Sequence, residues 1–404
     1  MKKFFIFAAA ACVAFASCVK NEPSFTNKSA EGAQVLFNAP VMGLATKGTE
    51  IRGEVFPTTR DFAVFGYYQE GNTDYNPDGT PELYMDEVKC DYVAGSVDAG
   101  EGTGTWKHAT DQYYWPKNGK LTFVAASPSE SIPAAECAYN ITSTKSTLVI
   151  DYTAPADSAK QVDVLYSDWK MNCTSSTEED YNVAYDGVEL AFNHALCIVR
   201  LNIKAQDAEA AAAVKVTGLS INQVYQKGTF TSNIAEDDYD WVYDGARADY
   251  TIIAPVSDAT MEAGAPYTGS KAITTDLQKF ANYILLPQHE FVEGSTIKIN
   301  YSIKHWGREA EDGEYVEKWL PQTHVFRLND PTVHVSMPTT DAEGNPVASA
   351  AITEWKKGTR YTYDITIGVK EIYFAPSVAD WEDVKVEYNN DAPQYKEENT
   401  LYGN

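Results

Sequence analysis

One loop has the spacing of the first half of a calcium-binding loop. Asp74, Asn76 and Asp78 place oxygen ligands at alternate positions, and Gly79 follows at the place of the sharp turn. The twelfth position, where such a loop carries a bidentate glutamate, is Met85. The Asn-Pro-Asp-Gly sequence inside the loop favours a solvent-exposed β-turn. We therefore expect a turn here and no metal site.

The other candidate catalytic or cofactor-binding residues lack the surrounding sequence motif that such a site requires. His194 and Cys197 are close in sequence but lie within an apolar stretch, where packing explains both. Residues 100–104 (GEGTG) resemble part of a dinucleotide loop, but no strand–helix–strand pattern surrounds them. The sequence has neither a GxSxG nor an HExxH motif. It predicts no enzyme and no cofactor.

The composition excludes some partners and favours β-structure. The chain has 404 residues and a net charge of −25, which argues against binding to nucleic acid. Aromatic residues make up 12%, with 26 Tyr, and these residues favour strands. The length suffices for about two domains of ~100–200 residues each.

The amino terminus predicts export. Lys2 and Lys3 precede an apolar run over residues 4–16, which is too short to span a membrane and reads as a secretory leader. Residues 15–18 (FASC) resemble a bacterial lipobox, which would make Cys18 a lipidated first residue that anchors the chain to the outer membrane. The alternative is ordinary leader cleavage with Cys18 incidental.

Four cysteines remain after Cys18, and an exported protein can form disulfides. They allow three pairings, between which the sequence does not choose. These residues are Cys90, Cys137, Cys173 and Cys197.

Period-two patterns dominate the rest of the chain. Residues 33–40 and 62–68 are expected strands, and residues 188–203 are apolar on both faces, as in a central strand. Residues 296–304 alternate between apolar and polar, with 314–319 as their hairpin partner. The one helical stretch is short, at 205–213. The pattern predicts two β-sandwiches with a boundary near residue 186.

Several short segments in a fixed order resemble the fimbrillin family, the subunits of protease-matured (type V) pili. The segments are FAVFGYY (62–68), YYWP (113–116), LTFVAASP (121–128), DVLYS (163–167), VELAFNHAL (188–196), GTFT (228–231), ILLPQ (284–288), WKKGTRYTYDI (355–365) and IYFAPSVADW (372–381). The resemblance implies an all-β fold of two tandem transthyretin-like β-sandwich domains. The implied organisation is a leader (1–17), a lipid anchor with a removable strand and a protease-sensitive loop (18–60), a first sandwich (61–186) completed by strand 33–40, and a second sandwich with a donor strand and tail (187–404).

The resemblance also implies a mechanism. The first strand, with Val35 and Phe37, completes the first sandwich and leaves after an Arg- or Lys-specific protease cuts behind it. Lys47 is the slightly favoured position of the cut and Arg52 the next, while Arg60 is third.

A strand from a neighbouring subunit then fills the groove by donor-strand addition. The implied donor comprises Val384, Val386 and Tyr388, with 372–378 as the alternative. The partners would be other pilin subunits and a trypsin-like maturing protease. The expected function is that of a stalk or tip subunit of an adhesive surface fimbria, whose ligand the sequence does not reveal. The alternative is a surface glycan-binding lipoprotein of a nutrient-uptake system.

Overall fold

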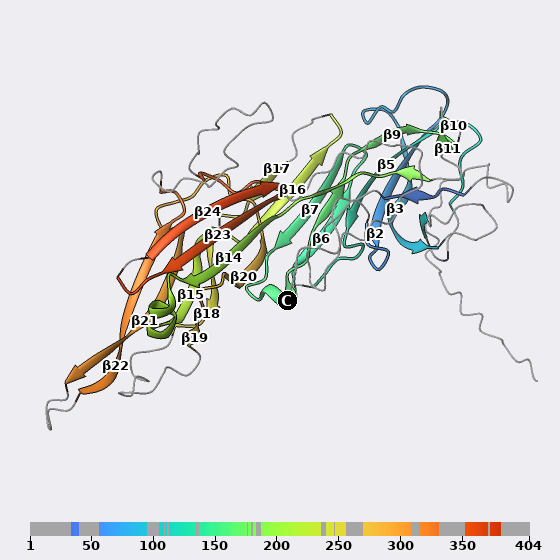
Figure 1. Cartoon of the computed structure of the whole chain (residues 1–404). Coiled ribbons are helices and arrows are strands. Elements are labelled where there is room, and N and C mark those ends of the chain that lie inside the picture. Colours follow the sequence, from blue (N-terminus) through green and yellow to red (C-terminus); the bar gives the residue numbers. More distant parts are fainter. Residues whose placement is uncertain are drawn as a thin grey trace, which may run out of the picture.

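The computed structural model describes most of the chain between residues 34 and 380. The described residues are 34–39, 56–94, 105–108, 110, 113–133, 137–175, 177–178, 181–182, 187–235, 240–245, 247–255, 270–308, 315–330, 352–370 and 372–380. Their regular structure is almost all strand, arranged in sheets that pack as sandwiches in an elongated molecule (Figure 1). The all-β prediction is confirmed. The described helix, α2 (Ala208–Ala213), is short, and none in the described part could span a membrane.

The first sheet contains nine strands. They are β1 (Phe37–Asn38), β2 (Phe62–Gln69), β3 (Glu82–Val93), β4 (Thr105–Lys107), β5 (Lys120–Ser127), β8 (Leu165–Ser167), β9 (Lys170–Cys173), β12 (Val188–Glu189) and β13 (Phe192–His194). Their order is β12-β1-β4-β3-β2-β5-β8-β13, and β9 pairs with β5. The strands at its two ends, β12 and β13, are separated in sequence by only Leu190 and Ala191. The sheet therefore curls so far that its two edge strands, β12 and β13, are connected by this two-residue segment.

Two neighbouring strands of this sheet, β2 and β5, are buried on both faces. Alternate residues enter two different cores, because successive side chains of a strand point to opposite faces. Phe62 and Phe123 pack inside the curl, whereas Phe65 and Val124 face a second sheet. Uninterrupted apolar runs such as residues 62–68 follow from this double burial.

The second sheet joins strands from the two halves of the sequence. It comprises β6 (Tyr139–Ser143), β7 (Thr147–Thr153), β16 (Lys227–Asn233) and β17 (Asp240–Tyr243). Its order is β17-β16-β7-β6, and the antiparallel β7–β16 pairing runs from Lys227 opposite Thr153 to Asn233 opposite Thr147. In Figure 1 these two strands run broadly along the long dimension of the molecule.

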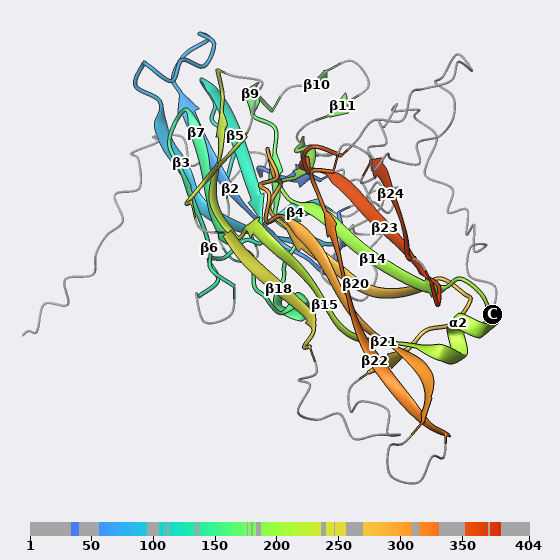
Figure 2. The same cartoon turned by 90° about the vertical axis from the view of Figure 1, so that its left-hand side faces the viewer.

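Two further sheets form the rest of the molecule. One has the order β20-β14-β23-β24, with β14 (Cys197–Ala205), β20 (Gln278–Leu285), β23 (Thr359–Ile367) and β24 (Ile372–Asp380). The other has the order β18-β15-β21-β22, with β15 (Val214–Tyr225), β18 (Arg247–Ile253), β21 (Thr296–Arg308) and β22 (Tyr315–Arg327), and β19 (Lys271–Ala272) pairs with β15. Figure 2 shows α2 at the turn where β14 leads into β15. A separate pair is β10 (Thr177–Glu178) with β11 (Tyr181–Asn182), and η2 (Ser158–Lys160) is a 3₁₀ turn.

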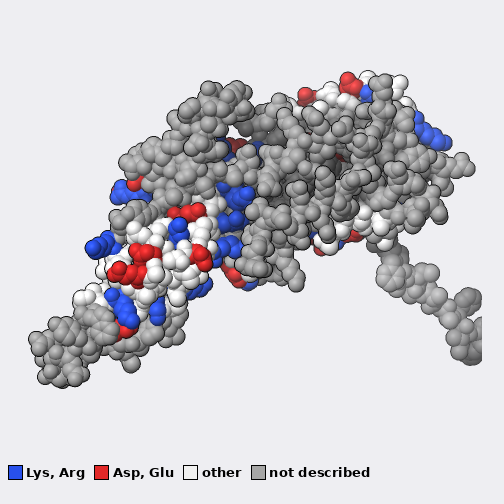
Figure 3. All heavy atoms as spheres, in the orientation of Figure 1, with Lys and Arg blue, Asp and Glu red and all other residues white. Residues whose placement is uncertain are grey.

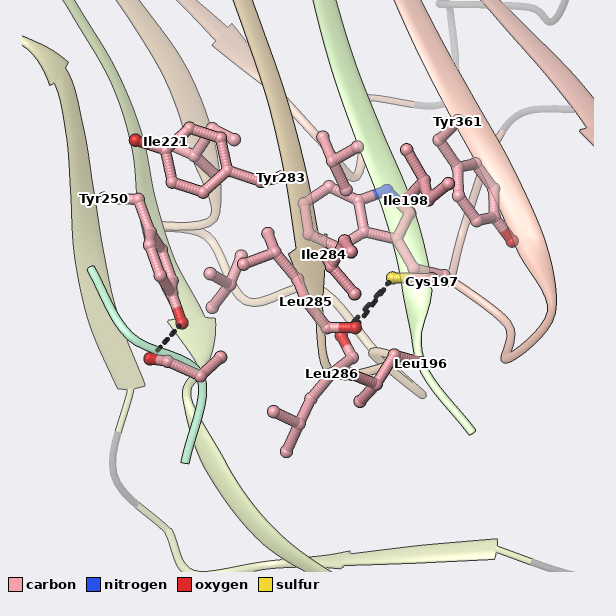
Figure 4. Close-up of a cluster of buried hydrophobic side chains, with 14 of the residues drawn as sticks. Leu196, Cys197, Ile198, Ile221, Tyr250, Tyr283, Ile284, Leu285, Leu286 and Tyr361 are labelled. Atoms are coloured by element: carbon pink, nitrogen blue, oxygen red, sulfur yellow. Dashed lines mark hydrogen bonds between the residues drawn. The ribbon is translucent and has the colours of Figure 1, made fainter. Parts of the chain in front are cut away.

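One continuous cluster of buried side chains links the second sheet to these two sheets. It includes Ile150 of β7, Phe230 of β16 and Ile284 of β20. Figure 4 shows part of it, where the Cys197 thiol donates to the carbonyl oxygens of Leu285 (3.4 Å) and Leu286 (3.5 Å). The two halves of the chain therefore share a core as well as a sheet.

The structure corrects one expected strand and confirms another. Residues 188–203 form not one central strand but β12, β13 and the first part of β14, because the chain passes from the first sheet into the third at Ala195 and Leu196. The hairpin expected from residue 296 onward is confirmed as β21 and β22, but both strands are longer than expected, so residues 296–304 pair with 319–327 and not with 314–319. The domain boundary near residue 186 stays a prediction. Three strands on its carboxyl side, namely β12, β13 and β16, pair with strands on its amino side.

Candidate functional site

The first strand inserts three alternate side chains into the curled sheet. Val35, Phe37 and Ala39 have exposed fractions of 3%, 0% and 1%. The residues that alternate with them, Gln34, Leu36 and Asn38, are only partly buried. This is the period-two pattern of a strand with one face on a core. The structure therefore buries Val35 and Phe37, the two residues proposed for the removable strand.

β1 lies between two strands that do not pair with each other. It is antiparallel to β4, with Phe37 opposite Trp106, and parallel to β12, with Phe37 opposite Val188. Val188 N and Leu190 N donate to carbonyls on either side of Phe37, at 2.7 and 2.9 Å. On the other edge, Val35 N donates to the Tyr113 carbonyl at 2.7 Å. Removal of β1 would leave backbone groups without partners along both edges of a gap between β4 and β12.

The gap is lined by aromatic rings. Seven rings form what we call the aromatic cluster: Phe37, Phe56, Phe62, Trp106, Trp115, Phe123 and Phe192. Phe37 packs edge-on against Phe123, with 5.2 Å between the ring centroids, and against Phe62, at 6.4 Å. Phe56 lies 5.1 Å from Phe192 and 5.9 Å from Trp106. All seven are at most 4% exposed, and the six that surround Phe37 make the floor of the gap strongly apolar.

Gly187 fits the backbone of β1 closely. Its φ is +84°, which a residue with a side chain rarely adopts. An added Cβ would lie 2.7 Å from the carbonyl carbon of Phe37 and 2.9 Å from the nitrogen of Asn38. Glycine at this position therefore lets the segment that begins β12 run directly against the first strand.

Most residues implied by the family resemblance lie outside the part of the chain that the structure describes. Val35, Phe37 and Arg60 are described, and Arg60 N donates to the Pro57 carbonyl at 2.8 Å. The lipidation position, the two favoured cleavage positions and the first donor candidate lie outside the described residues. These are Cys18, Lys47, Arg52, Val384, Val386 and Tyr388. The alternative donor, residues 372–378, forms part of β24, which pairs antiparallel with β23.

The loop around Asp74 forms the expected turn. Gly79 N donates to the Asn76 carbonyl, and Asp78 N donates to the Asn76 side-chain oxygen, both at 3.0 Å. The Asp74 carboxylate is bound by Lys120 at 2.8 Å. Among the residues that the structure describes, no group of three or more His, Cys, Asp or Glu side chains is arranged to hold a metal ion.

The described cysteines and His194 have structural partners. None of the four thiols after Cys18 forms a disulfide. Burial raises the pKa of the Cys90 and Cys197 thiols well above its usual range, and it also raises the pKa of Cys137. The ring of His194 contacts the buried Asp163 carboxylate at 3.1 Å. The Cys197 thiol donates to backbone carbonyls. The contacts given for His194 and Cys197 are therefore structural ones within the core.

Comparison with known proteins identifies the family. The family model described as fimbrillin-like matches residues 49–381, more than four-fifths of the chain. The chain belongs to the fimbrillin-like family. A search of curated protein sequences found no significant match.

One solved structure shows the same fold at low sequence identity, and a second is less similar. A fimbrial protein from Bacteroides vulgatus is 16% identical, with a TM-score of 0.53 over 86% of this chain and 99% of that one. The C-terminally truncated tip fimbrial protein Mfa3 from Porphyromonas gingivalis is 10% identical, with a TM-score of 0.31 over 80% of this chain and 94% of that one. The first of these similarities shows a shared fold for this fimbrillin-like chain.

Sequence reasoning missed most of the surroundings of the first strand. Phe56, Trp106 and Phe192 come from three separate segments, and only the fold brings their rings together. The special role of Gly187 could have been predicted from the sequence, since a glycine directly before an apolar run often marks a backbone conformation that other residues avoid.

Proposed function

We propose that this fimbrillin-like protein is a non-catalytic structural subunit of a surface fimbria that serves adhesion. The observation that carries the proposal is β1, a strand with a fully buried Phe37 that fills a gap between β4 and β12. A short strand that closes an apolar gap can be exchanged for an equivalent strand from another chain. The family match supports the same role.

The proposed route begins with export. The leader over residues 1–17 is removed, Cys18 is lipidated, and the acyl chains hold the precursor at the outer membrane until it joins the fimbria. A single acyl chain binds membranes only marginally, so stable anchoring needs more than one. The expected signature is the loss of membrane fractionation in Cys18→Ala.

Proteolysis after Lys47 or Arg52 would then release the first strand. Val35 and Phe37 contribute about 1.5–3 kcal/mol each by burial, and each backbone hydrogen bond adds about 0.5–1.5 kcal/mol. Ordering each residue of 34–39 costs about 1–2 kcal/mol. These contributions are of similar size, so a strand that is no longer attached to the domain is held weakly.

A longer donor strand from a neighbouring subunit would fill the same gap with more buried side chains. The donor would carry Val384, Val386 and Tyr388, or alternatively residues 372–378 of β24. Its apolar side chains would occupy the sites of Val35 and Phe37, and its backbone would pair with β4 and β12. Each additional buried side chain adds about 1.5–3 kcal/mol, which makes such a joint tight.

Limited trypsin digestion of the chain without its leader tests this proposal. N-terminal sequencing should find one early cut at Lys47 or Arg52, and an unboiled gel should then show a ladder of stable oligomers. Lys47→Gln/Arg52→Gln should give no ladder, whereas the matched control Lys117→Gln/Lys170→Gln should assemble normally. A stable uncut monomer, or a cut chain that stays monomeric, would overturn the proposal.

A further inference from the structure

A second feature lies far from the first strand along the sequence. A pocket of about 300 Å³ is lined by Lys271 and Ala272 of β19 and by Gln278, Lys279 and Phe280 of β20. β19 pairs with β15 and β20 pairs with β14, so these strands belong to different sheets. The pocket therefore lies where the edges of two sheets meet. Its volume is at the lower end of the ~300–1,000 Å³ typical of small-ligand sites.

The polar groups of this pocket are hydrogen-bond donors. Lys271 and Lys279 supply ammonium groups. The Gln278 side-chain oxygen accepts from Thr274 N at 3.2 Å, which leaves the amide NH₂ of Gln278 to donate elsewhere. Among the described residues that line the pocket there is no carboxylate, and Asp276, between the two lining segments, is not one of them. The described lining thus includes three side chains that carry hydrogen-bond donors.

The aromatic residue in the pocket adds an apolar surface. Phe280 is partly buried against the core, and the Lys271 ammonium lies 5.6 Å from its ring centroid. This cation–π contact holds the charge beside the ring. The pair combines a cation with an apolar surface at one place. Local positive sites of this kind exist despite the net charge of −25, and Figure 3 shows Lys and Arg interspersed with Asp and Glu on the described surface.

We propose that this pocket binds an acidic sugar unit of a polysaccharide. The carboxylate or sulfate oxygens of the sugar accept from Lys271, Lys279 and the Gln278 amide, while the C–H groups of the sugar ring contact Phe280. Charge-assisted hydrogen bonds of this kind are stronger than neutral ones. The volume of about 300 Å³ suits one sugar unit better than an extended acidic peptide. This inference goes beyond the proposed subunit role and does not depend on it, since the uncleaved monomer already has the pocket.

Titration calorimetry on the full chain expressed without its leader, with Cys18→Ala, tests the proposal. The probes are a hyaluronan hexasaccharide, which carries carboxylates, a heparin hexasaccharide, which also carries sulfates, and a neutral dextran oligosaccharide. We expect at least one acidic probe to bind, dextran to fail, and the affinity to fall as salt rises from 50 to 300 mM because exposed charges are screened. The stronger of the two acidic probes identifies the preferred anionic group.

Paired substitutions test the assignment of the residues. Lys271→Gln/Lys279→Gln should weaken binding by about tenfold or more. The matched control, Lys298→Gln/Lys318→Gln on β21 and β22, removes the same charge and should stay within about twofold. Thermal unfolding of both double variants checks that they are folded.

Three results would overturn the proposal. The first is that neither acidic probe binds at millimolar concentration, and the second is that the control pair weakens binding as much as the pocket pair. The third is that a polyglutamate peptide binds through the same lysines while both saccharides fail, which would replace the sugar by an acidic protein segment. Each result leaves the trypsin test of assembly unaffected.

Discussion

Truncation of Phe37 to alanine should loosen β1 while the rest of the first sheet stays paired. The ring is fully buried and packs edge-on against Phe123 and Phe62. Removing a buried phenylalanine side chain costs about 3–5 kcal/mol. Because β1 is only two residues long, we expect most of this loss to appear in the free energy of local opening of residues 34–39.

Hydrogen exchange read by mass spectrometry measures this local opening directly. A loss of 3–5 kcal/mol corresponds to exchange faster by roughly 100- to 4,000-fold, at tenfold per 1.4 kcal/mol. The matched control is Leu36→Ala, which shortens an apolar side chain on the outward, partly exposed face of the same strand. We expect its exchange to accelerate by less than about tenfold.

Two outcomes would refute this reasoning. One is an acceleration below tenfold in Phe37→Ala, or an equal acceleration in Leu36→Ala, which would mean that the buried ring does not hold the strand. The other is an equal acceleration across β7 and β16, which would mean that β1 cannot open separately from the rest of the molecule. In that case exchange of the strand between subunits would require global unfolding.

Three further predictions concern the surroundings of this strand, the joined halves and the thiols. Gly187→Ala should lower the free energy of unfolding by at least about 1 kcal/mol more than Gly71→Ala in urea titrations, because the added Cβ clashes with the backbone of β1; Gly71 has a similar φ of +81° but open space around an added Cβ. A fragment of residues 56–186 should lack cooperative thermal unfolding by circular dichroism, because it lacks β16, which pairs with its own β7. In the folded protein at pH 8, iodoacetamide should modify Cys173, which is partly exposed, whereas the raised pKa values of the buried thiols keep them protonated and unreactive until urea unfolds the chain. Those thiols are Cys90, Cys137 and Cys197.

Strands with one exposed face were predictable from the sequence. Residues 296–304 and 361–367 alternate between apolar and polar, and both segments form strands. The burial of 361–367 follows the alternation throughout. The burial of 296–304 follows it only at its start, since Ser302 is buried whereas Tyr301 and Ile303 are only partly buried. Residues 188–203 have no such alternation, because both faces of this segment are covered, and the break at Ala195 and Leu196 therefore left no periodic signal. The exchange of strands between the two halves depends on pairings far apart in the sequence, which local patterns do not encode.

The first strand was predictable only in part. Alternation over residues 33–40 indicated that Val35 and Phe37 share a face, and the structure buries both. The rings around them come from distant segments, and no local pattern connects Phe56 with Trp106 or Phe192. The pocket at Lys271 and Phe280 was missed for the same reason, since it forms only where the edges of two sheets meet.

The pairing of β7 with β16 has a mechanical consequence. These strands run broadly along the long dimension of the molecule and join its two halves (Figure 1). In the proposed fibre, tension applied along that dimension would pull the two strands past each other, so that all their hydrogen bonds resist at once. A flexible tether between the halves would instead extend under small loads. In such a fibre the shared sheet would make each subunit a stiff, shear-resistant link, so that the joints between subunits, and not the connection between the two halves, would be the first to yield under load.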